Sequence, residues 1–151
     1  MAYVKLNIHT MTDSKRYLLD TNILIDFLKE VPSVVEHVLQ VGTHKCCMSV
    51  ISLHELYFGA YLAKEKKEEY FMRELEKINI LLEYFSVLNL ETRGEEYARI
   101  KYALQKKGKP VDEFDMVIAG HALSEGLIIV TDNLKHFENM PDVKVENWMK
   151  H

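Results

Sequence analysis

The chain has 151 residues and a mass of 17.7 kDa, which suits one domain with one hydrophobic core. Hydrophobic residues make up 48% and charged residues 28%, a profile that excludes disordered and collagen-like proteins. The formal net charge of −4 counts at first against a nucleic-acid-binding domain, because such domains usually carry an excess of lysine and arginine.

No apolar run approaches the roughly 18 residues that span a bilayer, and the N-terminus lacks the apolar core of a secretory signal, so we expect neither. The two cysteines, Cys46 and Cys47, are neighbours in an apolar stretch. Because neighbouring side chains in a strand point to opposite faces, we expect two free thiols rather than a disulfide. Free thiols are typical of a reducing compartment, which favours a cytoplasmic protein.

Apolar patterning predicts strands that alternate with helices along the chain. The first half is predicted to form, in order, strand 16–19, helix 22–30, helix 32–41, strand 46–50, helix 52–63 beginning at Ser52, and helix 64–83. The second half is predicted to form edge strand 85–90, helices 92–107 and 113–125, buried strand 127–131 and a last strand within 143–147. Gly126 marks the end of the last helix, since glycine favours the left-handed conformation there.

Alternating strands and helices indicate βαβ units. The expected fold class is therefore α/β, a three-layer α/β/α sandwich with a central, mostly parallel sheet formed by residues 16–151. Residues 1–15 stand outside this domain as an N-terminal extension. Val4, Leu6 and Ile8 alternate as in a strand, and a disordered extension is equally compatible with the pattern.

Acidic residues follow three of the predicted strands. Asp20 comes directly after the first strand, Glu55 five residues after the second, and Asp132 soon after the buried strand near the C-terminus. Asp115 lies in the first turn of the preceding helix. Because ligands of open α/β sheets bind beyond the carboxyl ends of the strands, these acids are candidates for one shared site.

Each acid also has a structural explanation as a helix cap. Ser52 and Glu55 match a capping box, Asp112 suits an N-cap position with Asp115 in the first turn behind it, and Asp20 and Asp132 could each cap a following helix. Four such acids at one end of one sheet favour a common function. Capping does not exclude it, because an acid at a helix N-terminus stays ionised and able to bind a cation.

Carboxylates without paired cysteine or histidine ligands suit Mg²⁺, or Mn²⁺, rather than zinc. A hydrated divalent ion of this kind chiefly serves phosphate chemistry, where it activates water and neutralises phosphoryl oxygens. The chain contains no P-loop, GxGxxG, HExxH or GxSxG motif, so nucleotide-loop, zincin and serine-hydrolase functions have no support.

Four segments carry a specific set of motifs: YLLDTNILIDFLK at 17–29, MSVISLHELYFGA at 48–60, GKPVDEFDMVIAGHALSEGLIIVTDNLKHF at 108–137 and VENW at 145–148. In this order and spacing they resemble the PIN-domain nucleases, and within them the VapC-like toxins of bacterial toxin–antitoxin pairs. The resemblance covers most of the chain from Tyr17 onward. DTN alone is weak, but DTN combined with SLHEL, FDMVIAGHA and IVTDN is specific.

The resemblance assigns Asp20, Glu55 and Asp115 to the first three family acids, which would hold Mg²⁺, with Asp20 and Asp115 as its most direct ligands. The family usually carries a fourth acid or an asparagine two residues after the position of Thr131. This chain has Asn133 there and Asp132 one residue earlier.

The fourth site residue is therefore left open between Asp132 and Asn133, and Asp132 is retained as a catalytic candidate ranked below the other three acids. A later position that is sometimes acidic in the family is His136 here. Asn22 and Thr131 are polar neighbours that could position water or a carboxylate, and we count them with Asn133 as candidate substrate-binding residues.

The resemblance implies a compact α/β/α domain that cleaves single-stranded or looped RNA. Metal-activated water would attack phosphorus in line and leave a 5′-phosphate and a 3′-hydroxyl. The implied partners are the RNA substrate, a cognate antitoxin that inserts a segment into a groove near the active site, and a second copy of the chain in a homodimer. The alternative is a non-catalytic PIN-type module that binds RNA or protein.

Two surface features bear on binding. Lys106, Lys107 and Lys109 precede Asp115 and could form a basic lip for the RNA backbone, or simply the solvated end of a helix.

The second feature is a stripe of aromatic and apolar residues that follow Glu55: Tyr57, Phe58, Tyr61, Leu62, Tyr70 and Phe71. Packing in the hydrophobic core is the default expectation for such residues. Part of the stripe could instead bind an antitoxin helix or a second copy of the chain.

The net charge has a different meaning once a metal site is considered. Setting Asp20, Glu55 and Asp115 aside from the 23 acids leaves 20 acids against 19 bases, and setting Asp132 aside as well leaves 19 against 19. The excess of acids is thus about the size of the proposed metal site. A negative total does not exclude an RNA substrate.

Overall fold

The computed structural model describes residues 15–90 and 94–149, so the expected N-terminal extension, apart from its last residue, Lys15, lies outside the described residues. Its sheet has five strands in the order β3-β2-β1-β4-β5, and every neighbouring pair is parallel. The strands are β1 (Tyr17–Leu19), β2 (Cys46–Ser49), β3 (Ser86–Leu88), β4 (Ile128–Val130) and β5 (Val145–Glu146). All five were expected from the sequence, β3 at an edge as predicted.

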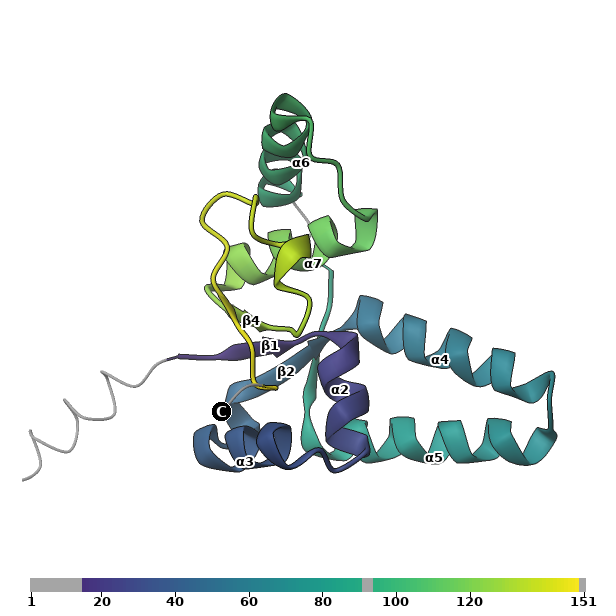
Figure 1. Ribbon diagram of the computed structural model, residues 1–151. Coiled ribbons are helices and arrows are strands. Elements are labelled where there is room, and N and C mark those ends of the chain that lie inside the picture. The colour runs from purple at the N-terminus through teal and green to yellow at the C-terminus, as the bar shows by residue number, and fades with distance from the viewer. Residues whose placement is uncertain (1–14, 91–93, 150–151) are drawn as a thin grey trace, which may run out of the picture.

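Helices cover both faces of this sheet (Figure 1). Helices α6 (Glu95–Lys107) and α7 (Glu113–Glu125) lie on one face, and α2 (Thr21–Leu28) and α3 (Pro32–Val41) lie on the other. Helices α4 (Val50–Lys64) and α5 (Glu68–Tyr84) form an antiparallel hairpin that projects beyond the sheet as an arm. The three-layer α/β/α fold is confirmed. Within the described ranges, no helix combines the length and apolarity needed to cross a bilayer.

The alternation of side chains along the strands builds two separate hydrophobic clusters. Leu18, Cys47 and Ile129 pack beneath α6 and α7, whereas their neighbours in the same strands pack beneath α2, α3 and α5. Cys46 and Cys47 accordingly belong to opposite faces, and both are buried free thiols, as predicted. These strands are apolar at almost every position because the short parallel sheet is buried on both faces.

Helix α4 begins two residues before the predicted start at Ser52. The side chain of Ser49 caps it, because the Ser49 hydroxyl accepts a hydrogen bond from the Ile51 amide at 3.1 Å. Ser49 is the last residue of β2, so the chain turns directly from strand into helix. The proposed capping box of Ser52 and Glu55 is therefore wrong, since both residues lie inside the helix.

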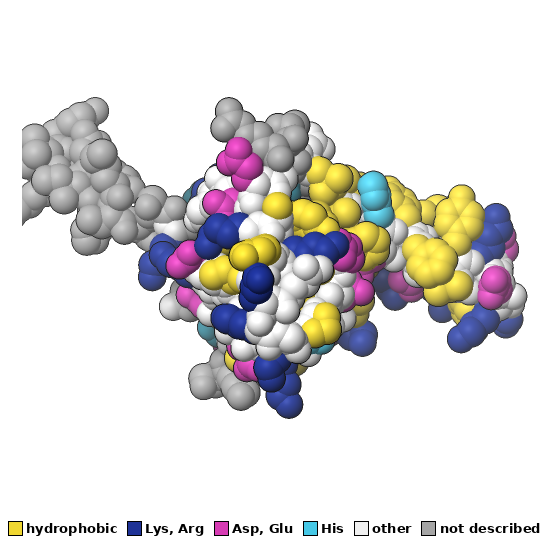
Figure 2. Space-filling model, turned by 90° about the horizontal axis from the view of Figure 1, so that it is seen from above, with side chains coloured by type: hydrophobic (Ala, Val, Ile, Leu, Met, Phe, Trp, Pro, Cys, Tyr) yellow, Lys and Arg dark blue, Asp and Glu magenta, His cyan; other side chains and the backbone are white. Residues whose placement is uncertain are grey.

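The aromatic stripe on the α4–α5 arm is largely exposed, so core packing is the wrong default for it. Phe58 is 65% exposed and Tyr61 59%, and Figure 2 shows hydrophobic side chains gathered along the projecting arm. The predicted charged helix also begins later than expected, at Glu68, because α4 continues to Lys64 before the chain turns. Because the arm projects beyond the sheet (Figure 1), too few other elements pack against it to bury both of its faces.

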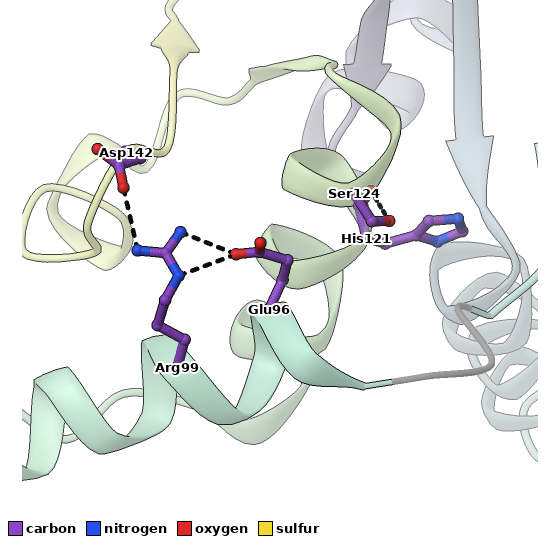
Figure 3. Close-up of polar contacts among 5 residues, drawn as sticks. All are labelled: Glu96, Arg99, His121, Ser124 and Asp142. Carbon is purple, nitrogen blue, oxygen red and sulfur yellow. Dashed lines mark hydrogen bonds and ion pairs between the residues drawn. The ribbon is translucent and has the colours of Figure 1, made fainter.

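An ion-pair cluster ties α6 to the loop that leads into β5 (Figure 3). The Arg99 guanidinium donates a hydrogen bond to the Glu96 carboxylate on its own helix at 2.8 Å. It donates another, at 3.0 Å, to the Asp142 carboxylate in the loop that leads into β5. Lys107 adds a hydrogen bond from its ammonium to the Asn139 carbonyl at 3.2 Å. These contacts hold the segment after β4 against α6.

We expect Gly120→Ala to destabilise the fold, because a Cβ at this position in α7 would stand 2.8 Å from the backbone nitrogen of Tyr97 in α6. The two helices would have to move apart, at a cost of about 1–3 kcal/mol in the free energy of unfolding. Gly59→Ala in α4 is the matched control, since no atom lies within 4 Å of its added Cβ and alanine favours helix. Urea unfolding checks both variants; equal stabilities would contradict the packing argument.

Candidate active site

Asp20 stands at the centre of the cleft because strands β1 and β4 lie side by side. The Asp20 amide donates to the Val130 carbonyl at 2.9 Å, and the Thr131 hydroxyl donates to Asp20 Oδ2 at 3.0 Å. The other carboxylate oxygen, Oδ1, accepts from the Thr21 amide at 2.9 Å and caps α2. Asp20 therefore caps a helix, which was one of the two roles expected for it from the sequence. These two hydrogen bonds also fix the directions of both of its carboxylate oxygens.

Glu55 reaches the same cleft from the second turn of α4. The Thr21 hydroxyl donates to the Ser52 hydroxyl at 3.0 Å, which fixes the first turn of α4 against the start of α2. Ser52 is fully buried, and Glu55 follows it by three residues on the exposed mouth of the cleft. The hydroxyl pair therefore sets the distance between the elements that carry Asp20 and Glu55.

Asp115 enters from α7, where Asp112 caps the helix by accepting from the Phe114 amide at 2.9 Å. The Asp115 side chain is 16% exposed, and its Oδ2 lies 2.8 Å from Nδ1 of His136. His136 belongs to η2 (Leu134–His136), a single turn after β4. Sequence reasoning noted His136 only as a departure from the family acid, and missed its contact with Asp115.

The three acids line one open cleft of about 370 Å³. Asn22 and Asn133 line it too, as do three residues that the sequence did not single out for this site: Thr21, Asp112 and Phe114. Asp132 is exposed and does not line the cleft, although its charge acts on Asp20. Thr131 is fully buried behind Asp20. Lys106, Lys107 and Lys109 are exposed at the end of α6 and in the following loop, outside the lining.

All three carboxylates have pKa values raised above the ordinary value. The pKa of Asp20 is raised chiefly by burial, against the hydrogen bonds from Thr21 and Thr131, which lower it. The pKa values of Glu55 and Asp115 are raised by partial burial and by repulsion from Asp20, and His136 lowers that of Asp115. In the described part of the chain, no lysine or arginine forms an ion pair with any of the three.

An all-oxygen set of this kind fits a hard divalent cation. Among the described residues no three acidic, histidine or cysteine side chains converge into a closed ligand set. Mg²⁺ needs no such set, because it is typically bound by one or two carboxylates and keeps several waters. Three mutually repelling carboxylates in an open cleft therefore match the donor chemistry of Mg²⁺ or Mn²⁺ better than that of zinc.

The family model for the PIN domain matches residues 17–143. The chain belongs to the PIN domain family. The chain is 37% identical over 135 residues to the ribonuclease VapC2 of Haemophilus influenzae, covering 89% of this chain and 98% of the relative. It is 35% identical over 136 residues to a tRNA(fMet)-specific endonuclease VapC of Salmonella typhimurium, covering 88% and 98%.

Solved structures of PIN-domain relatives agree with the fold. A DNA-bound VapBC structure from Salmonella typhimurium superposes with a TM-score of 0.77 at 34% identity, over 89% of this chain and 98% of that one. VapBC2 from Rickettsia felis, bound to a promoter DNA fragment, gives a TM-score of 0.76 at 29% identity, over 87% and 98%. The fold and family resemblance expected from the sequence motifs are confirmed.

We expect Glu55→Gln to stabilise the metal-free fold at neutral pH. A raised carboxyl pKa means that the folded state binds protons more tightly than the unfolded state, so the free energy of unfolding falls as pH rises above about 4.3, the ordinary pKa of glutamic acid. The substitution would remove one repelling charge and make that fall smaller. Thermal unfolding in EDTA between acidic and neutral pH measures it.

The control for this charge change is Glu76→Gln, which makes the same substitution at an exposed position of α5. This variant should leave the pH dependence of unfolding unchanged, because Glu76 has no part in the cleft. A steeper loss of stability with pH in the Glu55→Gln protein would contradict the proposed repulsion among the three acids.

Proposed function

We propose that this PIN-family chain is a divalent-metal-dependent endoribonuclease of the VapC type, the toxin of a toxin–antitoxin pair. The observation that carries the proposal is the meeting of Asp20, Glu55 and Asp115, from three elements far apart in the sequence, in one cleft at the carboxyl ends of β1, β2 and β4. The identity to VapC ribonucleases over nearly their whole length supports it. The free, buried cysteines are compatible with action in the reducing cytoplasm.

In this proposal Asp20 and Asp115 are the direct ligands and Glu55 completes the site at its mouth. When bound, Mg²⁺ or Mn²⁺ supplies activation of water and neutralisation of the phosphoryl oxygens. Thr131 and the Thr21 amide hold the Asp20 oxygens in place, and His136 orients Asp115. Asn22 and Asn133 line the cleft as neutral groups that can hold water or a phosphate oxygen.

The ends of two helices favour a phosphodiester in the cleft. Helix α2 begins at Thr21 and α7 begins at Glu113, so the positive ends of both dipoles face the cleft. Hydrolysis breaks the bond from phosphorus to the 3′-oxygen and leaves a 5′-phosphate and a 3′-hydroxyl. Lys106, Lys107 and Lys109 lie beyond the lining, where they can contact the RNA backbone.

Transfer RNA is the first substrate class to test. Two relatives at 35% identity are named tRNA(fMet)-specific endonucleases. The loops of a transfer RNA also offer unpaired nucleotides, which reach an open cleft more readily than a duplex does.

The proposed antitoxin partner would bind beside the active site. A second depression of about 500 Å³ runs between α2, α4 and α5, and it shares Thr21, Asn22 and Glu55 with the catalytic cleft. A neighbouring depression on the arm, lined by Leu62 and Tyr70, shares Gly59 and Glu74 with it. An antitoxin segment lying there would cover both the apolar arm and the mouth of the cleft.

We also propose that the chain forms a homodimer through α3 and α5. An apolar depression of about 490 Å³ is lined by Val35, Ile80 and Tyr84, and Leu39 beside them is 73% exposed. Leu39→Asp should convert a dimer to a monomer in light scattering, because it would place a charge in that surface. Gln40→Asp, one residue along α3 and outside the depression, should leave the dimer intact. A monomeric unmodified chain contradicts this part of the proposal.

Asp20→Asn and Asp115→Asn should each abolish RNA cleavage and growth inhibition while retaining the fold. We expect a loss of more than about a hundredfold in cleavage rate, because even residues that only orient metal ligands contribute about 10–100-fold. Asp26→Asn, on α2 outside the cleft, is the matched control and should remain active. Cleavage is measured on purified RNA by sequencing the new ends.

Metal binding separates this function from the alternative of a non-catalytic RNA- or protein-binding module. Calorimetric titration with Mg²⁺ or Mn²⁺ should detect binding to the unmodified chain and to Asp26→Asn, and weaker binding to Asp20→Asn. No binding at millimolar metal favours the inert module. Undiminished cleavage in excess EDTA would falsify the metal-dependent mechanism.

A further inference from the structure

Phe114 is the one large apolar side chain that lines the catalytic cleft in the described part of the chain. Its side chain is 52% exposed, and every other residue lining the cleft is polar or charged. It directly precedes Asp115 in the first turn of α7. The Phe114 amide donates to the capping carboxylate of Asp112, so the ring is carried by a fixed backbone.

Packing of the fold does not account for this ring. Met116, Val117 and Ile118 on the same helix belong to or pack against the hydrophobic cluster beneath α6 and α7, but Phe114 contributes to neither cluster. An isolated exposed phenylalanine on a protein surface is ordinary. An exposed phenylalanine beside three carboxylates, on a rigid helix end, is positioned for a ligand that has both a flat apolar face and a phosphate.

An unpaired nucleotide has this combination. The three carboxylates that line the cleft repel a phosphate group until a cation is bound, so a contact that does not depend on charge would add to the affinity for RNA. Aromatic side chains supply such contacts by stacking on bases, and unpaired RNA is commonly recognised in this way.

We propose that Phe114 is a base-stacking residue for RNA, holding an unpaired base next to the scissile phosphate while Asp115, its neighbour in sequence, holds the catalytic metal. The proposal rests on the ribonuclease function proposed above. It makes Phe114 a specificity residue for unpaired over paired RNA, because a base within a duplex offers no free face. It also predicts tolerance of base identity, since every base has a stacking face.

The test uses the full chain with Mg²⁺ and a single-stranded oligoribonucleotide that spans a mapped cleavage site. Phe114→Leu keeps an apolar side chain of similar bulk but removes the ring, and Phe114→Trp keeps an aromatic ring. We expect Phe114→Leu to raise the KM for the oligoribonucleotide about tenfold or more, with Phe114→Trp close to the unmodified chain. Calorimetric affinity for Mg²⁺ should be the same in all three proteins.

An abasic nucleotide then identifies the stacked base. Replacing the nucleotide on one side of the scissile phosphate by an abasic residue should weaken binding to the unmodified chain about as much as Phe114→Leu does. The same replacement should cost nothing further in the Phe114→Leu protein, because the contact is already lost. Additive losses at both flanking positions would overturn the stacking assignment.

Two further outcomes are informative. A Phe114→Leu protein that cleaves normally but binds the antitoxin more weakly overturns the proposal and assigns the ring to the protein partner instead. Normal cleavage by Phe114→Leu beside inactive Asp20→Asn overturns the stacking role alone and leaves the ribonuclease function standing. An unmodified chain that cleaves no RNA overturns both.

Discussion

The hydrogen bond from Thr131 to Asp20 is the contact on which the arrangement of the cleft depends. It exists because β1 and β4 are adjacent parallel strands whose carboxyl ends coincide, with Leu19 paired to Val130. The chain passes from β1 outward to β2 and β3 and returns to the other side of β1 as β4. This reversal leaves a crevice beside β1, and residues separated by 111 positions in the sequence meet there.

The cleft concentrates negative charge at a cost to the fold. Burial raises the pKa values of Asp20, Glu55 and Asp115, and repulsion from Asp20 raises those of the other two further, so the ionised site opposes folding at neutral pH. The two hydrophobic clusters on opposite faces of the sheet offset that opposition, since neither depends on the site. A scaffold stabilised away from its cleft can keep three repelling carboxylates ready for a cation.

Periodicity was enough to predict the order of strands and helices, and position relative to the strands indicated four candidate acids, Asp20, Glu55, Asp115 and Asp132. The resemblance to PIN-domain nucleases ranked Asp132 below the other three, and Asp132 does not line the cleft. The start of α4 was not predictable from residues 49–55 alone, because it depends on where β2 stops pairing with β3, at Ser49 opposite Leu88. The contact of His136 with Asp115 escaped prediction for a related reason. It arises from a single turn without periodicity, which is followed directly by Phe137, a buried residue of the cluster beneath α6 and α7.

The net charge of −4 is about as large as the charge of the acids proposed for the metal site, so it says little about the sign of the surface around the cleft. A carboxylate that repels phosphate in the free protein becomes part of an RNA-binding surface once a divalent cation lies between them. Affinity before that point has to come from groups outside the carboxylate set, of which the structure offers two kinds. Lys106 and Lys107 at the end of α6 and Lys109 in the following loop can attract the RNA backbone from a distance, and the ring of Phe114 offers an uncharged surface beside Asp115. Local placement of these groups, rather than total charge, decides whether such a chain can act on RNA.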